Sequence, residues 1–330
     1  MRCELEQDDD IGTFPGVTLF TKSTTHCIKP TAVYFSPKHS VSGNVLNVVL
    51  WLHGFYVRNH KFLFHNDRAR IREQVRDCGK DVVLIAPFLG FEYAVDDTHF
   101  AGNYSVEDLA TPKWGERYLN EVLAALSHFL VPDARPPIQL QVDKLIIACH
   151  SGGGVGMRNL VGNLGKYQSN LRACWGFDCL LGEDAKPDDA TFWWQWLSGP
   201  NGRALDIIYG PSTLPQSVKL DLIGRGLATP KGDKAEPRRA ALKNLNVSIG
   251  HYDAFPAFGQ MVKVNDLDPA FVDRFMIPPA ADVTPSKHKP RPDRTFLQQA
   301  IANVRREFPF PKDIHYMIAR GSFLDRLSKL

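Results

Sequence analysis

The segment 144–157, KLIIACHSGGGVGM, places a serine between an apolar run and a cluster of glycines. The apolar run ends at Cys149, Ser151 follows two residues later, and a helix is predicted to begin near Gly153. A serine at a sharp strand-to-helix turn keeps its hydroxyl exposed, and small neighbours are needed because the two backbones nearly touch. The amide of Gly152 would then point from a helix start, where developing negative charge is stabilised. The pattern predicts a nucleophilic serine.

Other interpretations of these residues are weaker. The third glycine of a dinucleotide-binding fingerprint is replaced by Met157, and the phosphate-binding pattern GxxxxGK[ST] is absent from the sequence. His60, His65 and Asp67 do not match a zinc-site spacing. A glycine-rich turn with an unimportant serine stays open as an alternative. The sequence therefore implies no cofactor and no metal.

The turn around Ser151 resembles the nucleophile elbow of the α/β-hydrolase fold, with Cys149 in place of the usual first glycine. This departure is mild, because the position requires a small residue rather than glycine in particular. The resemblance implies an α/β protein with a mostly parallel central sheet, flanking helices and lid-like insertions. It also implies a serine hydrolase with a Ser-His-Asp triad and a backbone oxyanion hole.

A second motif, WLHGF at 51–55, follows another apolar run. In the family that the chain resembles, the loop after an early central strand carries such a His-Gly turn, and the next amide completes the oxyanion hole. Here that amide belongs to Phe55, and Gly54 lets the chain turn beneath the substrate carbonyl. The alternative is that His53 is a buried histidine that forms hydrogen bonds within a turn.

The general base must be a histidine, because a serine hydroxyl is a weak nucleophile until an imidazole accepts its proton. The resemblance implies the chain order serine, acid, histidine, and the histidines after Ser151 are His251, His288 and His315. His288 lies in a stretch rich in Pro and Lys. His315 precedes a short amphipathic helix that ends the sequence, where the family places its base, so it is favoured over His251. His251 follows the predicted strand 247–249 and stays the alternative.

The predicted acid is Asp178, at the carboxyl end of the predicted strand 172–177. A charged side chain in so apolar a run is costly unless it is paired, and a histidine partner would meet that cost. The position resembles the family variant in which the earlier strand carries the acid. Asp206 and Asp253 are the alternatives.

The cluster FWWQW at 192–196 has two interpretations. Trp193 and Trp196 could line an acyl or leaving-group pocket, since ligand pockets are mostly apolar and aromatic. They could equally belong to a helix that buries both indoles in the core.

Short apolar runs and periodic segments alternate along the chain. The runs 45–52, 82–86, 144–149, 172–177, 205–209 and 247–249 predict strands, and segments 69–78, 114–130, 155–164 and 295–308 predict helices. This alternation predicts an open, mostly parallel α/β sheet, with an antiparallel hairpin at 18–34 along its edge. We expect one domain, 1–330, with insertions near 183–202 and 253–292.

Composition fits a soluble globular protein: of 330 residues, 44% are hydrophobic and 23% are charged. The net charge of +3 is too small to indicate binding to nucleic acid. No run reaches the roughly 18 apolar residues of a membrane span. The amino terminus is acidic where a signal peptide would be basic, and the 6 cysteines form no CxxC pair. A cytoplasmic location is expected, with export by a route that needs no signal peptide left open.

Together these features predict a serine hydrolase that cleaves a carboxylic ester, with an amide as the less favoured substrate, through an acyl-enzyme. The expected partner is a small-molecule or acyl-type substrate. The alternative is a non-catalytic binding protein that retains the α/β-hydrolase fold. The sequence makes no prediction of the oligomeric state.

Overall fold

The structure is a computed structural model of the chain. It describes residues 6–7, 16–26, 29–36, 39, 44–55, 57–64, 69–94, 100–130, 138–179, 192–193, 195–197, 203–209, 245–249 and 314–330. The predicted helix 295–308, the predicted insertion 253–292 and most of the insertion 183–202 lie outside these residues. Contacts within the chain group its residues into two compact units, Met1–Cys174 with Phe323–Leu330, and Trp175–Ser322.

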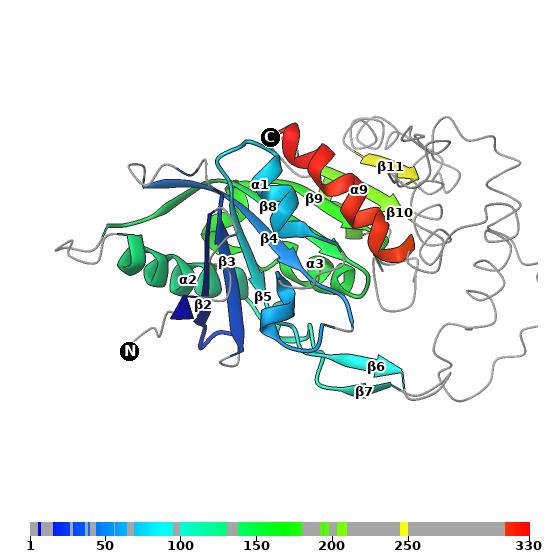
Figure 1. The fold of residues 1–330 in the computed structure, drawn as a ribbon, viewed down its shortest axis with the longest axis horizontal. Coiled ribbons are helices and arrows are strands. Elements are labelled where there is room, and N and C mark those ends of the chain that lie inside the picture. Colours follow the sequence, from blue (N-terminus) through cyan, green and yellow to red (C-terminus); the bar gives the residue numbers. More distant parts are fainter. Residues whose placement is uncertain are drawn as a thin grey trace, which may run out of the picture. The chain divides into compact units, whose positions relative to one another are not determined.

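The first unit is built on a sheet whose strands follow the order β1-β2-β3-β5-β4-β8-β9 (Figure 1). The bounds are β1 Glu6–Gln7, β2 Val17–Lys22, β3 Pro30–Phe35, β4 Val45–Leu52, β5 Val83–Pro87, β8 Gln141–His150 and β9 Leu171–Phe177. Strand β4 pairs in parallel with both β5 and β8, whereas β1, β2 and β3 pair antiparallel, and β3 pairs antiparallel with β5. A separate hairpin joins β6 (Glu92–Ala94) to β7 (Phe100–Gly102).

Strands β4, β5 and β8 form the centre of the core, because their side chains are apolar on both faces. All five residues of β5 are buried, as are the last five of β4 and the last six of β8. Such continuous apolar runs are expected in parallel strands that are covered by helices on both faces.

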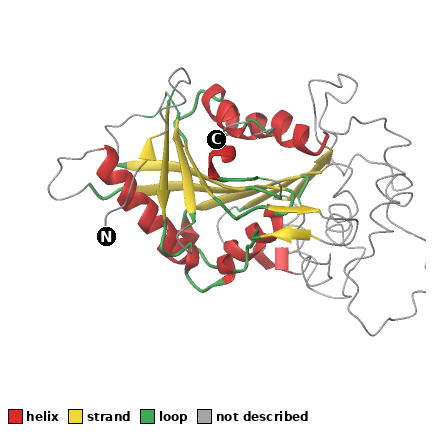
Figure 2. Ribbon diagram, turned by 60° about the horizontal axis from the view of Figure 1, so that its bottom comes forward, coloured by secondary structure: helices red, strands yellow, loops and turns green. Residues whose placement is uncertain are grey.

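Helices cover both faces of this sheet (Figure 2). Their bounds are α1 Ile71–Asp77, α2 Trp114–Leu130, α3 Gly153–Val161 and α9 Ile314–Ser328, with 3-10 helices η2 His60–Leu63, η3 Asp108–Ala110 and η4 Gly165–Ser169. Successive side chains of a strand point to opposite faces. Leu52 of β4 approaches Gly156 of α3, whereas Trp51 packs on Phe323 of α9 with ring centroids 5.1 Å apart. Helix α3 and the end of α9 therefore lie on opposite faces of β4.

The second unit contains the end of β9, then β10 (Ala204–Tyr209) and β11 (Leu245–Ile249). Strands β10 and β11 pair in parallel from Leu205 opposite Leu245 to Tyr209 opposite Ile249. Leu205, Ile207 and Ile208 are fully buried. These strands continue the alternation of apolar runs that the sequence displays.

The prediction of an α/β protein with a mostly parallel sheet and flanking helices is confirmed. The predicted strand 45–52 and helix 114–130 coincide with β4 and α2. The predicted hairpin 18–34 is β2 and β3. Helix α3 begins at Gly153, as the serine turn predicts, so Gly153 and Gly154 belong to the helix despite their low helix propensity.

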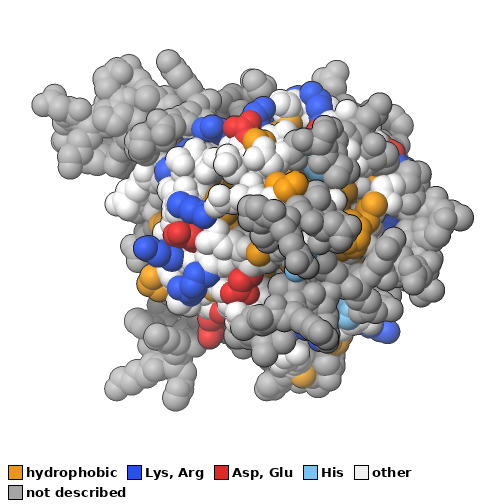
Figure 3. All heavy atoms as spheres, turned by 90° about the vertical axis from the view of Figure 1, so that its left-hand side faces the viewer, with side chains coloured by type: hydrophobic (Ala, Val, Ile, Leu, Met, Phe, Trp, Pro, Cys, Tyr) orange, Lys and Arg blue, Asp and Glu red, His pale blue; other side chains and the backbone are white. Residues whose placement is uncertain are grey.

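The surface of the described residues mixes charges of both signs. On the face seen in Figure 3, Lys and Arg side chains lie interspersed with Asp and Glu side chains. None of the described helices has the length and apolar character that crossing a membrane requires.

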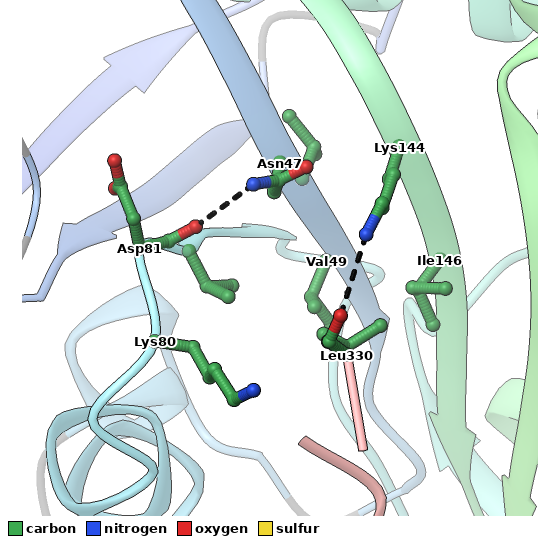
Figure 4. Close-up of a pocket in the computed structure, with 9 residues that line it drawn as sticks. Asn47, Val49, Lys80, Asp81, Lys144, Ile146 and Leu330 are labelled. Atoms are coloured by element: carbon green, nitrogen blue, oxygen red, sulfur yellow. Dashed lines mark hydrogen bonds between the residues drawn. The ribbon is translucent and has the colours of Figure 1, made fainter. Parts of the chain in front are cut away.

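A cavity of about 70 Å³ lies beside the amino-terminal halves of β4 and β8 (Figure 4). Two hydrogen bonds border it: Asn47 Nδ2 donates to the carbonyl of Asp81 (3.2 Å), and Lys144 Nζ donates to the carbonyl of Leu330 (3.3 Å). Sites for small molecules usually enclose about 300–1,000 Å³. The cavity is too small for such a ligand, and it lies away from the carboxyl ends of these strands, where Ser151 follows β8.

Candidate active site

Ser151 occupies the turn between β8, which ends at His150, and α3, which begins at Gly153. Its φ of 56° lies in the left-handed region, which is uncommon for a residue other than glycine and costs about 1–3 kcal/mol. The first turn of α3 holds this conformation, since the amide of Gly154 donates to the carbonyl of Ser151 over 3.2 Å. The structure thus contains the strained strand–serine–helix turn that the sequence predicts.

The glycines after Ser151 are needed because two backbones cross there. A Cβ added to Gly153 would lie 2.2 Å from the carbonyl oxygen of Leu52, a distance that real Cβ atoms do not show. A Cβ on Gly152 would lie 2.8 Å from the ring of Phe55. Helix α3 therefore begins directly against the loop that follows β4.

Gly54 of that loop lies against the side chain of Ser151. A Cβ added to Gly54 would lie 2.4 Å from the Cβ of Ser151 and 2.9 Å from its hydroxyl oxygen. Only a residue without a side chain allows the loop to come so close. The two sequence motifs, WLHGF at 51–55 and the serine turn, therefore meet at one point of the fold.

His53 fixes this loop through both of its ring nitrogens. The amide of Leu89 donates to Nε2 over 2.8 Å, so the proton of a neutral ring must sit on Nδ1, which donates to the carbonyl of Gly54 over 2.6 Å. Burial lowers the pKa of His53 to about 3, which outweighs the opposing effect of the bond to Gly54. His53 is thus a buried neutral histidine that forms hydrogen bonds within a turn, as the second interpretation of the sequence held.

Tyr104 supports the same loop from the segment between β7 and η3. Its hydroxyl donates to the carbonyl of His53 over 2.9 Å, and its ring meets the ring of Phe55 edge to face at 4.8 Å. Sequence reasoning missed Tyr104 and Leu89, because neither lies in a motif. Strand β5 brings Leu89 to His53, and the segment after β7 brings Tyr104 there.

Asp178 lies one residue after β9, in the second unit. It is fully buried, its φ of 42° is left-handed, and its amide donates to the carbonyl of Ile208 over 2.7 Å. The alternative acid Asp206 lies within β10 and is 8% exposed. The second alternative, Asp253, lies outside the described residues.

The structure describes only one of the two candidate bases. The backbone of His315 belongs to the first turn of α9, which begins at Ile314, so His315 lies inside the last helix rather than before it. His251 lies outside the described residues.

Trp193 is fully buried and Trp196 is 6% exposed. Their rings meet edge to face at 5.5 Å, and the guanidinium of Arg203 lies 5.7 Å from the ring of Trp196. Both indoles therefore belong to a packed aromatic cluster of the second unit.

Among the described residues, no cluster of three or more His, Cys, Asp or Glu side chains could hold a metal ion. His60 instead packs edge to face on Phe20, with ring centroids 5.0 Å apart. His65 and Asp67 lie outside the described residues.

Comparisons with known proteins found similarity to solved structures only. No protein-family model matches the sequence, and a search of curated proteins found no match. An S-formylglutathione hydrolase from Agrobacterium tumefaciens has 16% identity and a TM-score of 0.40, over 76% of this chain and 90% of that one. A feruloyl esterase module from Clostridium thermocellum has 11% identity and a TM-score of 0.42, over 74% and 79% of the two chains.

Since these TM-scores lie below 0.5, the fold is assigned from the topology of this chain itself. Its sheet is mostly parallel and covered by helices. A strained serine follows the carboxyl end of a central strand, and a His-Gly turn from the neighbouring strand lies against it. These features together give the chain an α/β-hydrolase-like fold.

Proposed function

We propose that this protein is a serine hydrolase that cleaves carboxylic esters. Ser151 is the nucleophile, the amides of Phe55 and Gly152 form the oxyanion hole, Asp178 is the acid and His315 is the base. His251 is the alternative base, and Asp206 and Asp253 are the alternative acids.

One observation carries the proposal: the left-handed Ser151 lies against Gly54, directly before the start of α3. The proposal assigns two amide donors to the oxyanion. Gly152 is the cap residue at the start of α3, where the helix dipole favours negative charge. Phe55 follows directly on Gly54, so its amide belongs to the peptide that begins beside Ser151.

The reaction follows from these roles. The hydroxyl oxygen of Ser151 attacks the ester carbonyl while the imidazole takes its proton, and the two amides bind the oxygen that becomes negative. The tetrahedral intermediate then collapses, and the leaving alcohol receives the proton from the imidazolium. Water, deprotonated by the same imidazole, attacks the acyl-enzyme and releases the acid, which restores Ser151.

The acyl group of the substrate is proposed to be apolar. Trp193 and Trp196 would supply an aromatic wall for it, because ligand pockets are lined mostly by apolar side chains. Esters are favoured over amides because most enzymes of the resembled family cleave esters.

The direct test is turnover of p-nitrophenyl acetate and p-nitrophenyl butyrate by the full chain. Ser151→Ala should lower kcat by at least about 10³-fold. Ser169→Ala, at an exposed serine whose hydroxyl donates to the carbonyl of Lys166, is the matched control and should keep wild-type kcat. Equal turnover by wild type and Ser151→Ala would refute the nucleophile. A wild type that binds esters without turnover would instead indicate a binding protein with this fold.

The base is tested with His315→Gln and His251→Gln, assayed side by side. Loss of the base should lower kcat by several orders of magnitude, because the serine then has no proton acceptor. The proposal expects this loss for His315→Gln only. A loss confined to His251→Gln would move the role to that residue.

A further inference from the structure

A second buried histidine, His26, lies on the turn between β2 and β3. The described part of this turn is held by Glu121 of α2, whose carboxylate accepts hydrogen bonds from the hydroxyls of Ser23, Thr24 and Thr25 at 2.7–2.9 Å. The side chain of His26 is fully buried, and the reaction proposed above does not use it.

Both ring nitrogens of His26 face acceptors. Nδ1 lies 2.8 Å from Oδ2 of Asp108, and Nε2 lies 2.9 Å from the carbonyl oxygen of Phe88. A backbone carbonyl can only accept, so Nε2 must donate. The Asp108 carboxyl binds the other ring nitrogen, Nδ1, so both nitrogens have partners and the ring is fixed against Phe88.

The bond to Phe88 continues into the candidate active site. The Phe88 carbonyl and the Leu89 amide belong to one peptide group, and that amide donates to His53 Nε2 over 2.8 Å. His53 Nδ1 donates to the Gly54 carbonyl over 2.6 Å. The Gly54 carbonyl and the Phe55 amide belong to the next peptide group in the series.

The donors in this series all point the same way, from His26 towards Phe55. Hydrogen bonds in such a chain polarise one another, by about 10–30% per bond, and a low local dielectric strengthens the effect. A carbonyl that accepts a bond makes the amide of the same peptide group a stronger donor. The hydrogen bond from His26 therefore acts, through the series, on the amide of Phe55.

We propose that His26, held in place by Asp108, is a positioning residue that fixes and polarises the Phe55 amide through Phe88–Leu89, His53 and Gly54. This inference rests on the proposed function, because it gives the Phe55 amide its role in the oxyanion hole. Segment 88–91 is suited to transmit the effect. Phe88 donates to Pro30, Phe91 donates to Asn103, and the Leu89 carbonyl accepts from the amide of Ser105.

The matched control is the pair His39 and Asp81, in which Nδ1 lies 2.7 Å from Oδ1. The side chain of His39 is also buried, at 4% exposure. Asp81 precedes β5, so this pair lies at the opposite end of the strand from Phe88. A variant of His39 therefore removes a comparable buried histidine without touching the series of bonds.

The first experiment measures protonation by ¹⁵N NMR of the ring nitrogens in the wild-type chain. His26 should show a protonated Nε2, and His53 should show a protonated Nδ1 with a bare Nε2. Signals are assigned with His26→Gln, or with Asp108→Asn if that variant does not fold. A bare Nε2 on His26 would overturn the proposal.

The second experiment measures ester turnover. Loss of one oxyanion-hole donor costs about 10²–10³ in kcat, and His26→Gln should cost less, about tenfold, because the donor is weakened rather than removed. KM should change less than twofold, since the effect appears only as charge develops. His39→Gln should keep wild-type kcat. An unchanged kcat in a folded His26→Gln variant would contradict the proposal.

These two experiments separate failure of the inference from failure of the proposed function. If the wild type does not hydrolyse esters, or Ser151→Ala is fully active, the proposed function fails. The NMR result then still decides whether the series of bonds from His26 exists. If Ser151 is required but Nε2 of His26 carries no proton, only the inference fails.

Discussion

The backbone of Gly54 lies directly against the side chain of Ser151. A Cβ added to Gly54 would come within 2.4 Å of the Ser151 Cβ and 2.9 Å of the hydroxyl oxygen. This contact joins the turn after β4 to the turn after β8. It brings Gly54 and the serine hydroxyl, which are far apart in the sequence, close together.

We expect Gly54→Ala to lower esterase kcat by at least about 10²-fold, because the added methyl must displace Ser151 or the loop, and small misplacements of this kind are costly. Gly162→Ala is the control, since nothing lies within 4 Å of the Cβ added there. Steady-state kinetics of the two variants make the comparison. Wild-type kcat in Gly54→Ala would mean that the close approach is unimportant.

Gly153→Ala should affect stability. The added Cβ would lie 2.2 Å from the Leu52 carbonyl oxygen, which is backbone and cannot rotate away. We expect a loss of about 1–3 kcal/mol in the free energy of unfolding, typical of overpacking, measured by urea denaturation. Gly162→Ala should change stability by less than this loss. The expectation fails if Gly153→Ala is as stable as the wild type.

His53 predicts a specific dependence of stability on pH. Its pKa is about 3 when folded against a usual value of 6.5, so below pH 6.5 the unfolded chain binds a proton that the folded chain does not. Stability from this group is fully present above pH 6.5 and falls by up to about 1.4 kcal/mol per pH unit as the pH drops towards 3.

The test compares urea unfolding of wild type and His53→Gln at pH 7 and pH 5. Glutamine has a donor and an acceptor but does not titrate, so the variant should lose less stability than the wild type over this interval. Parallel losses in the two proteins would show that His53 is not buried in its neutral form.

Asp178→Asn tests the acid of the triad. Asparagine tolerates the left-handed φ of 42° and keeps the shape of the side chain, but it no longer stabilises an imidazolium. We expect kcat to fall by about 10⁴-fold, as in serine proteases that lose the triad carboxylate. Asp206→Asn, at another buried aspartate, should keep most of its activity. The reverse result would assign the acid to Asp206.

Much of the fold could be predicted from the sequence because it depends on local patterns. The strand 45–52 and the helix 114–130 follow from apolar periodicity, and the Ser151 turn follows from a strand that runs into three glycines. Such signals need no knowledge of distant contacts.

The support of the site could not be predicted in this way. His26 meets Asp108 across 82 residues, and Leu89 meets His53 across 36. Neither pair has a spacing rule, because the sheet order places β5 between β3 and β4 and so brings the ends of separate strands together. The identification of His53 as a buried histidine that forms hydrogen bonds within a turn likewise depends on which groups face its two nitrogens.

The central claim is that Ser151 is the nucleophile, and the site of covalent labelling tests it most directly. The chain is treated with a fluorophosphonate, digested with trypsin and analysed by mass spectrometry. The account predicts an adduct on the peptide 145–158, LIIACHSGGGVGMR, in which Ser151 is the sole hydroxyl side chain. An adduct on another peptide, or a folded protein that hydrolyses esters while this peptide stays unlabelled, would contradict it.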